Sequence, residues 1–381
     1  MKMIRFTCLF FVIIFLLTAV FGGIIFSLTP KVMAEASYSS AKAMCVMEAS
    51  SKRVLNSKNM DTKLAMASTT KIMTAITAIE NCDDLDKTFE ISPKAVGVPG
   101  TSLYLRKGEV FSTRDLLYGL MLISGNDASV AIGEHISGTI SKFVDLMNKT
   151  AKKIGATNSH FDNTHGLDSK THYTTAYDLA LITSYAMQNP TFKEIVSTKN
   201  AKITNADGKT RYLKNKNKLL NSFDGCNGVK TGFTDDAGRC LVSSAERDGM
   251  DVVCVVLNCG LMFEECSRFM EEAFASYKLY DLTKFYNLPS EIAVTNGRQE
   301  SVKIGTFGEY LYPLTESEKE SVQIKYELVK SLEAPIEKGQ EVGKVEIYVG
   351  KDLHFSEKIF TIESVRRNSL WQKLFDVLTE W

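Results

Sequence analysis

Apolar residues recur at helical spacing through the middle of the chain. The window from Thr70 to Ile79 places its large apolar side chains on one face of a helix. The same spacing predicts four further helices: Arg114–Ile123, Lys142–Ile154, Thr175–Met187 and Phe263–Tyr280. Thr113 is expected to cap the first of them, and Asn189-Pro190 is expected to end the third. A largely helical region is therefore expected between residues 70 and 187.

Runs typical of β-strands lie on both sides of this helical region. Ala43–Met47 and Arg53–Leu55 flank a polar turn like the two strands of a hairpin, and Asp207-Gly208 marks a second hairpin. The later strands are expected at Lys199–Thr204, Thr210–Leu213, Asn227–Gly232, Arg239–Ala245 and Asp251–Leu257. Strands at both ends of a helical middle favour one α/β domain, in which an antiparallel sheet brings the early hairpin beside the later strands.

From about Leu288 to Ile362 the helical pattern fades, and short β-prone runs separated by Asn-Gly, Lys-Gly and Gly-Lys turns replace it. These runs predict a small all-β domain: Ile292–Val294, Ser301–Ile304, Val322–Tyr326, Lys344–Val349 and Lys358–Ile362. The tail, Ser364–Trp381, is helical again, with one apolar face that carries two tryptophans beside basic residues. It is either an amphipathic helix lying on a membrane surface or a helix packed on its own β-domain or a partner.

The N-terminus has the pattern of a secretory signal peptide. Lys2 and Arg5 precede the apolar run Phe6–Leu28, and Val32-Met33-Ala34 resembles a cleavage site. The run is also near the ~20 residues that span a bilayer, so an uncleaved anchor is the alternative. Both interpretations place the remainder across the cytoplasmic membrane. The expected fold class is α+β with several domains, divided into residues 1–34, 35–286, 287–363 and 364–381.

Composition excludes some function classes. Lys plus Arg and Asp plus Glu number 45 each in 381 residues, so the overall charge indicates no nucleic-acid partner. Seven of the eight cysteines follow the N-terminal apolar run without paired spacing, and we expect mostly free buried thiols, with a disulfide as the alternative. Five scattered histidines show no ligand spacing, so no metal and no other cofactor is expected.

Three short polar motifs occur in order along the chain. They are Ser68-Thr69-Thr70-Lys71, Ser124-Gly125-Asn126 and Lys230-Thr231-Gly232. Each alone is weak, because Ser-x-x-Lys also occurs from Ser39 to Lys42. Their context carries the information: the first motif begins a predicted helix, the second lies between two helices, and the third lies on a strand.

The residue types in these motifs suit acyl transfer. A serine hydroxyl needs a base within hydrogen-bond reach, and Ser68 and Lys71 share one helix face at i and i+3. A lysine with an ordinary pKa of about 10.4 is protonated, but burial and a second cation, Lys230, both lower that pKa. Ser124 and Asn126 can hydrogen-bond this pair and pass a proton to a leaving amine.

The same motifs also offer groups that bind a substrate. The N–H of Ser68 at a helix N-terminus and the N–H of Phe233 are expected to stabilise an oxyanion. Gly232 lacks a Cβ, so a substrate can lie against this strand. Lys230 and Thr231 are suited to bind a substrate carboxylate.

The three motifs resemble the S-x-x-K, S-x-N and K-T-G boxes of the penicillin-binding protein and serine β-lactamase superfamily. More narrowly, the chain is similar to the low-molecular-mass D-alanyl-D-alanine carboxypeptidases. The stretches that carry this resemblance cover nearly the whole chain after the signal: Ala67–Ala75, Leu122–Ala128, Thr164–Asp168, His172–Ala180, Gly228–Thr234, Pro335–Val345 and the C-terminal helix.

The resemblance implies a β-lactamase/transpeptidase-like domain with a helical subdomain, and it implies a role for each motif. Ser68 is acylated, Lys71 is the base, Ser124 and Asn126 form a second wall, and Lys230 and Thr231 bind the terminal carboxylate. The implied substrates are peptidoglycan stem peptides ending in D-Ala-D-Ala, and β-lactam antibiotics would acylate the same serine. The implied activity is removal of the terminal D-alanine during peptidoglycan maturation, outside the cytoplasmic membrane.

Two positions depart from this family pattern. Phe233 stands where the family often has His or Tyr. Leu261-Met262-Phe263 stands where the family tends to carry an arginine, and Arg268 is the nearest basic residue along that helix.

Several alternatives to a carboxypeptidase follow from the same motifs. A β-lactamase of related fold uses a glutamate within Glu-x-x-x-Asn, but Glu134 and Glu194 are followed four residues later by Gly138 and Thr198. A non-catalytic envelope protein that binds peptidoglycan is the second alternative, and a transpeptidase shares the same acyl-enzyme. His165 and His172 lie in one loop, where we expect structural hydrogen bonds rather than a Ser-His-Asp triad.

Overall fold

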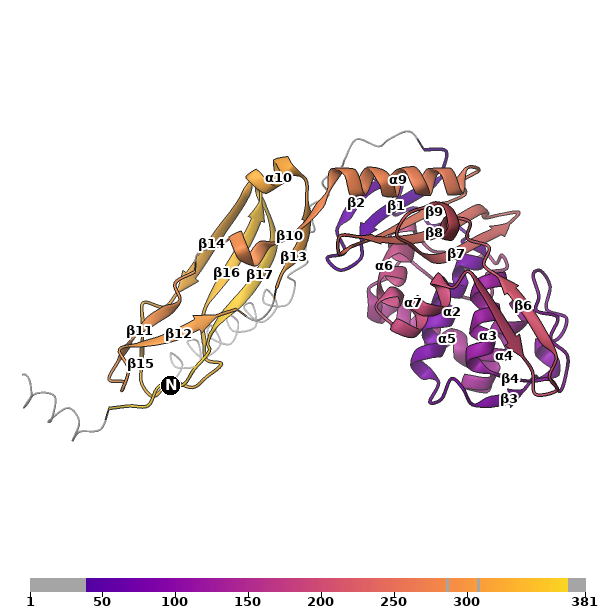
Figure 1. Ribbon diagram of the computed structural model, residues 1–381, viewed down its shortest axis with the longest axis horizontal. Helices are drawn as coiled ribbons and strands as arrows, with labels where there is room; N and C mark the ends of the chain where they lie inside the picture. Colours follow the sequence, from indigo (N-terminus) through magenta and orange to yellow (C-terminus); the bar gives the residue numbers. More distant parts are fainter. Residues whose placement is uncertain (1–38, 286–287, 307–308, 369–381) are drawn as a thin grey trace, which may run out of the picture. The chain divides into compact units, whose positions relative to one another are not determined.

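The computed structural model describes residues 39–285, 288–306 and 309–368 (Figure 1). Within these ranges an antiparallel five-stranded sheet runs in the order β2-β1-β9-β8-β7. Its strands are β1 (Ala43–Glu48), β2 (Val54–Lys58), β7 (Cys226–Thr234), β8 (Gly238–Arg247) and β9 (Met250–Leu257). Strand β1 pairs with β9, Ala43 opposite Leu257, so the predicted position of the early hairpin beside the late strands is confirmed.

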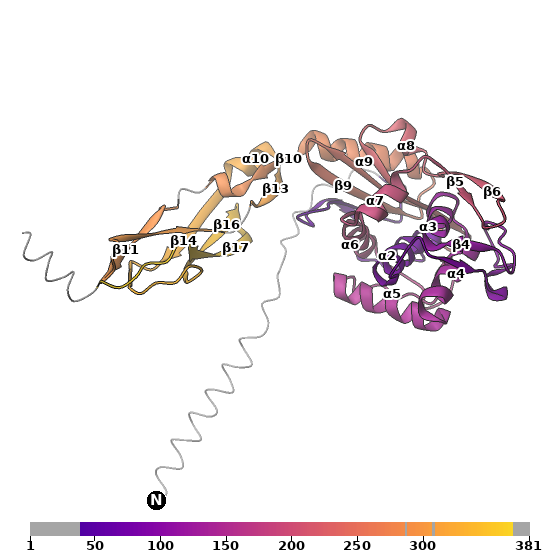
Figure 2. The ribbon, with the colours of Figure 1, turned by 60° about the horizontal axis from the view of Figure 1, so that its bottom comes forward.

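Helices cover both faces of this sheet (Figures 1 and 2). On one face α9 (Met262–Ser276) packs Phe269 and Met270 into an apolar cluster with Met44 and Val256. The other face meets a helical region centred on α2 (Lys71–Asn81), where each fully buried large apolar side chain, such as Ile72 or Met73, contributes roughly 1.5–3 kcal/mol. The region also contains α3 (Thr113–Tyr118), α4 (Asn126–Ser137), α5 (Ile140–Ile154), α6 (Ala176–Met187) and α7 (Pro190–Ser197).

Three smaller elements complete the first part of the chain. Strands β3 (Thr88–Glu90) and β4 (Val110–Ser112) form one hairpin-like pair, and β5 (Asn200–Thr204) and β6 (Thr210–Lys214) form another. The short helix α8 (Leu219–Ser222) precedes β7.

Side-chain caps set the starts of several helices. Thr139 caps α5 and Thr175 caps α6, each accepting a hydrogen bond from a backbone N–H three residues later. The prediction that Thr113 caps α3 was wrong. Ser112 is the cap and accepts from Asp115 N at 3.0 Å, because Thr113 is already helical.

Two predicted helix ends were also wrong. The helix predicted to reach Ile123 is α-helical only to Tyr118, and Gly119–Ile123 forms a π-helix. The helix predicted to reach Tyr280 ends at Ser276, since the next residues form strand β10 (Lys278–Asp281).

Beyond residue 288 the described chain is almost entirely β. A six-stranded sheet runs in the order β14-β16-β17-β12-β11-β15 over a core that includes Val302, Val345 and Ile359. Its strands are β11 (Glu291–Thr295), β12 (Ser301–Gly305), β14 (Val322–Leu328), β15 (Ser331–Glu333), β16 (Glu341–Val349) and β17 (Asp352–Thr361). The α+β class, with an all-β region following the helical one, is confirmed.

Three short elements of this region were not predicted. They are β13 (Leu311–Leu314), which pairs with β10, the strand β15, and helix α10 (Glu316–Glu320). None is longer than five residues, so none shows a periodic apolar pattern. Thr315 caps α10 and exchanges reciprocal hydrogen bonds with Glu318, an arrangement that involves only four consecutive residues.

The predicted signal peptide and residues 369–381 of the predicted C-terminal helix lie outside the described residues. For the described start of that tail, 364–368, the prediction of a helix was wrong. This segment is extended, because Val365 forms a β-bridge with Ile336 and Arg367 forms one with Gly297. No helix within residues 39–285, 288–306 and 309–368 combines the length and apolar character needed to cross a membrane. The seven cysteines from Cys45 to Cys266 all lie in the described part of the chain. All seven are free thiols and five are buried, so the prediction of mostly free structural thiols is confirmed.

Candidate active site

The first motif forms a tight turn directly before α2. A 3-10 turn spans Ala67–Thr70, and α2 begins at Lys71. The hydroxyl of Thr70 donates to Ala67 O at 2.8 Å and holds the turn closed. Ala67 has a φ of +48°, an uncommon conformation for a residue with a Cβ. This turn leaves Ser68 half-buried, at the edge of a pocket.

Lys71 makes three hydrogen bonds and is completely buried. Its Nζ donates to Ser68 Oγ at 2.9 Å, to Asn126 Oδ1 at 2.7 Å and to the backbone carbonyl of His165 at 2.6 Å. All three acceptors are neutral, so no carboxylate touches the amine among the described residues. The motif residues Ser68, Lys71 and Asn126 are therefore in direct contact.

Burial and two neighbouring cations act on the protonation of Lys71. Burial is the largest cause that lowers the pKa of Lys71 well below its ordinary value, and the charges of Lys230 and Lys216 follow. The pKa of Lys230 is itself lowered to about 7, first by burial and then by Lys216. A lowered pKa increases the share of Lys71 that is neutral, and a neutral amine can accept the proton of the Ser68 hydroxyl. Lys216 was not among the predicted site residues, because it lies in none of the three motifs.

The second motif follows the π-helix Gly119–Ile123, a conformation that is rare in general and frequent at functional sites. Ser124 has a φ of +72°, and its Oγ is buried without a hydrogen-bond partner in the described part of the chain. Asn126 Nδ2 donates to Pro99 O at 2.6 Å, which turns Oδ1 toward Lys71. Asn126 thus contacts the amine, whereas Ser124 hydrogen-bonds neither Ser68 nor Lys71.

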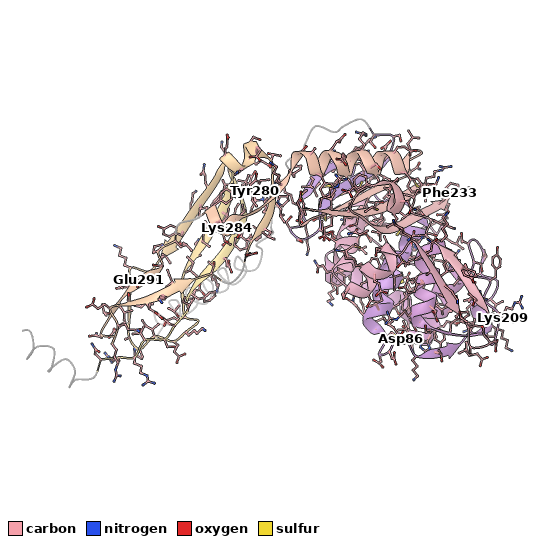
Figure 3. The ribbon with its side chains drawn as sticks, viewed as in Figure 1. Asp86, Lys209, Phe233, Tyr280, Lys284 and Glu291 are labelled. Atoms are coloured by element: carbon pink, nitrogen blue, oxygen red, sulfur yellow. The ribbon has the colours of Figure 1, made fainter. Side chains whose placement is uncertain are left out.

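The third motif lies on β7, the edge strand of the five-stranded sheet. Lys230 is buried, and its Nζ donates to Thr231 O at 2.9 Å. A Cβ on Gly232 would lie 3.1 Å from Ser68 N. Gly232 therefore allows strand β7 to approach the Ser68 turn. The sequence analysis had predicted only that the missing Cβ leaves room for a substrate. The side chain of Phe233, labelled in Figure 3, is 63% exposed.

A loop that includes His165 and Gly166 closes the site beside Lys71. The His165 carbonyl accepts from Lys71 Nζ, a role that the motif analysis did not assign. Gly166 has a φ of +92°, and a Cβ there would lie 1.9 Å from Ala67 O. The loop backbone and the Ser68 turn are thus packed directly on each other, and only glycine fits between them.

His172 holds the same turn through its side chain. Its Nδ1 accepts from Asp162 N at 3.0 Å, so the ring proton is on Nε2, which donates to Thr70 Oγ1 at 2.8 Å. Burial is the main cause that lowers the pKa of His172 to about 4, which keeps the ring neutral. Neither His172 nor His165 donates a ring hydrogen bond to Ser68 within the described residues, in agreement with a structural role.

A pocket of about 430 Å³ lies in front of Ser68. Lys71, Asn126 and Lys230 do not line it and lie behind its wall. No acidic side chain lines this pocket, and the described ranges contain no cluster of three His, Cys, Asp or Glu residues that could hold a metal ion. The lining residues are Ser68, Thr101, Ser124, Lys216, Lys218, Thr231, Gly232, Phe233, Arg239, Met262 and Phe263.

Comparison with known proteins gives matches over both parts of the chain. Residues 30–260 match the family described as D-alanyl-D-alanine carboxypeptidase, and residues 275–367 match the penicillin-binding protein 5, C-terminal domain. The D-alanyl-D-alanine carboxypeptidase DacF of Bacillus subtilis is 32% identical over 312 residues, which is 80% of each chain. DacA of Haemophilus influenzae is 30% identical over 354 residues, 89% of this chain and 88% of that protein. The crystal structure of penicillin binding protein 5 from Haemophilus influenzae superposes with a TM-score of 0.73 and 28% identity, covering 88% of this chain and 100% of that chain.

Proposed function

The chain belongs to the D-alanyl-D-alanine carboxypeptidase family of serine hydrolases, and from that premise we propose that Ser68 is its nucleophile and Lys71 its general base. One observation supports this assignment most: the 2.9 Å hydrogen bond between Lys71 Nζ and Ser68 Oγ, made by a buried lysine with a lowered pKa. When the amine is neutral, its two N–H groups donate to Asn126 Oδ1 and His165 O, and its lone pair accepts from the Ser68 hydroxyl. Proton transfer to a positioned base of this kind contributes typically ~10²–10⁴-fold to the rate.

The first half-reaction forms an acyl-enzyme. Ser68 Oγ bonds to the carbonyl carbon of the penultimate D-alanine while its proton moves to Lys71 Nζ. The backbone N–H groups of Ser68 and Phe233 stabilise the oxyanion. The C–N bond then breaks, and the terminal D-alanine leaves after its amine takes a proton from Lys71 through Ser124. Ser124 Oγ does not contact Lys71 in the described structure, and it has no other partner there, so in this proposal it rotates to bridge Lys71 and the leaving amine.

The second half-reaction releases the shortened peptide. Water gives one proton to Lys71 and attacks the ester carbonyl, and the Ser68 oxygen leaves as the hydroxyl is restored. Asn126 keeps Lys71 in place through both steps, because its amide is fixed between Lys71 Nζ and Pro99 O. A β-lactam antibiotic acylates Ser68 by the same first half-reaction, and the reaction stops at the resulting ester.

Two residues of the third motif bind the terminal carboxylate of the substrate in this proposal. Thr231 lines the pocket and offers its hydroxyl. Lys230 lies behind the pocket wall and acts through its charge, since its Nζ bonds Thr231 O rather than facing the cavity.

The positions of two glutamates support a carboxypeptidase over a β-lactamase. Glu134 accepts from Ser92 and pairs with Lys94 at 3.3 Å. Glu194 accepts from the hydroxyl of Tyr118 at 2.8 Å. Neither glutamate lines the pocket, so neither is placed to activate a water for rapid deacylation.

The division of the chain follows from this function. We propose a signal peptide over 1–34, a catalytic domain over 35–286, a β-domain from 287 that includes the bridged residues up to 368, and a membrane-associating helix over 369–381. Peptidoglycan lies outside the cytoplasmic membrane, so the enzyme acts on the extracytoplasmic face while peripherally attached to the membrane.

The test is incubation of the purified protein with a peptide ending in D-Ala-D-Ala. Free D-alanine is expected from the wild-type protein, and labelled penicillin is expected to remain covalently attached. Ser68→Ala should abolish both signals. The matched control is Ser39→Ala in the second Ser-x-x-Lys copy, because the Ser39 hydroxyl donates to Glu265 and contacts no lysine amine.

Each failure in this experiment identifies a different alternative. Labelling that persists in Ser68→Ala places the nucleophile elsewhere. Rapid release of the label with little D-alanine indicates a β-lactamase. No label and no product from the wild-type protein indicates a non-catalytic protein.

A further inference from the structure

Three cationic side chains line the pocket in front of Ser68, and no carboxylate lines it to balance them. Lys216 acts on the buried lysines and lowers the pKa of both Lys71 and Lys230. Lys218 lies over the ring of Phe263, with its Nζ 5.5 Å from the ring centroid. The third cation, Arg239, has no role in the site described so far.

Strand pairing places Arg239 close to Thr231. In the β7–β8 ladder Thr231 is opposite Leu241 and Phe233 is opposite Arg239. Side chains two positions apart on a strand share a face, so Arg239 and Thr231 are diagonal neighbours on one face of the sheet. Diagonal neighbours are about 7–8 Å apart, which a long side chain spans. Both residues line the same pocket, as this geometry requires.

The guanidinium of Arg239 is available to a ligand. The residue is exposed, and no carboxylate in the described ranges pairs with it, including Asp235 and Asp236 in the adjoining hairpin turn. Its backbone is held in place, because Arg239 O accepts from Cys259 N at 2.8 Å. A fixed backbone with a free guanidinium is the arrangement expected of a binding residue.

The other arginine near this end of the sheet is already occupied. Arg268 pairs with Glu272 at 2.9 Å and lies over the ring of Phe269, and it does not line the pocket. Helix α9 contributes the apolar side chains Met262 and Phe263 to the lining instead. An apolar wall beside a guanidinium strengthens its attraction for an anion, because less water screens the charges.

We propose that Arg239 binds the C-terminal carboxylate of the substrate together with the Thr231 hydroxyl. This inference rests on the proposed function and names the cation that selects a peptide with a free terminal carboxylate. The planar guanidinium fork matches a carboxylate in two parallel hydrogen bonds, which a lysine cannot reproduce. In this chain strand β8 thus supplies the carboxylate-binding cation, and helix α9 supplies an apolar wall.

The test compares two peptides that differ only at the C-terminus, one ending in a free carboxylate and the other in a primary amide. For Arg239→Gln, kcat/KM for the acid peptide should fall about 10- to 100-fold, the range of a bidentate charge-assisted contact. The slow hydrolysis of the amide peptide should change less than twofold. Arg239→Lys should recover part of the activity on the acid peptide, because it retains charge but loses the fork.

The matched control is Arg268→Gln, which removes the occupied arginine and should leave both peptides unaffected. Thermal unfolding of Arg239→Gln and Arg239→Lys should match that of the wild-type protein, since Arg239 is exposed. Equal losses on the acid and amide peptides would overturn the proposal, and so would full activity of Arg239→Gln. A different result would contradict the proposed function itself, namely a wild-type protein that releases no D-alanine at all.

Discussion

At the scale of single residues, the site depends on where positive charge is placed. Lys71 bonds only neutral oxygen atoms, and the nearby charges that act most on it are those of Lys230 and Lys216. Each of these cations disfavours a proton on its neighbours. Lys216 is the exposed member of this set, so its charge can be removed without opening a cavity.

Lys216→Gln is expected to shift the pH dependence of acylation. Removing a cation makes the protonated form of Lys71 easier to hold, so the pKa of Lys71 rises and less of it is neutral at pH 7. The rising limb of the acylation rate with labelled penicillin, measured against pH, should therefore move to higher pH. Lys214→Gln on strand β6 is the control, since Lys214 is not among the causes that act on Lys71. An unchanged profile would mean that Lys216 does not tune the base.

Sequence analysis found the residues of the site that lie in motifs and missed those that reach it from elsewhere. Ser68, Lys71 and Asn126 were identified from short spacings and are in contact. The His165 carbonyl is a backbone group, which any residue type could provide. Arg239 depends on the register between two strands, which no local pattern specifies.

At the scale of elements, long periodic segments were predicted well and interruptions were not. Helix α5 and strands β8 and β9 agree with prediction because each shows a strong apolar pattern. Pro190 was expected to end a helix, and it also begins α7, where its missing N–H is not needed. The π-helix before Ser124 was missed because its residues are as apolar as those of an α-helix.

Packing between the His165 loop and the Ser68 turn gives an element-scale prediction. Gly166→Ala should lower the free energy of unfolding by at least about 2 kcal/mol and reduce penicillin acylation, because the new Cβ meets Ala67 O. Gly155→Ala is the matched control, with a φ of +93° against +92° and nothing within 4 Å. Gly155→Ala should lower the free energy of unfolding only by the strain of its backbone conformation, about 1 kcal/mol, and should leave penicillin acylation normal. Chemical denaturation measures the free energy of unfolding of both variants. Equal losses in Gly166→Ala and Gly155→Ala would show that the contact between the loop and Ala67 O is unimportant.

At the scale of the whole molecule, the question is what attaches the enzyme to its surroundings. The all-β region has its own core, and the chain then continues into the predicted amphipathic tail. In the predicted helix Trp371 and Trp381 would share one apolar face, and Arg366 and Arg367 precede it in the sequence. Such a composition favours the interface between lipid and water.

Deleting Leu370–Trp381 should release an active enzyme from the membrane fraction. The deletion leaves all site residues in place. The rate of D-alanine release should therefore stay within about twofold of that of the full-length protein, well short of the tenfold change that corresponds to about 1.4 kcal/mol. Fractionation by centrifugation and a penicillin label measure location and activity together. A truncated protein that still sediments with the membrane would assign the attachment to the N-terminal apolar run instead.

The seven free thiols make the time of folding the period of greatest chemical risk for this protein. In the native state burial raises the pKa of Cys240 to about 11 and also raises that of Cys45, and Cys254 Sγ and Cys266 Sγ lie 3.5 Å apart inside the core. Thiolates rather than thiols react, so the five buried thiols are protected against oxidation in the folded protein. Before the core closes, the same seven groups are exposed together and can cross-link in many wrong pairings. If the proposed signal peptide exports the chain before it folds, rapid folding therefore protects these thiols against oxidation.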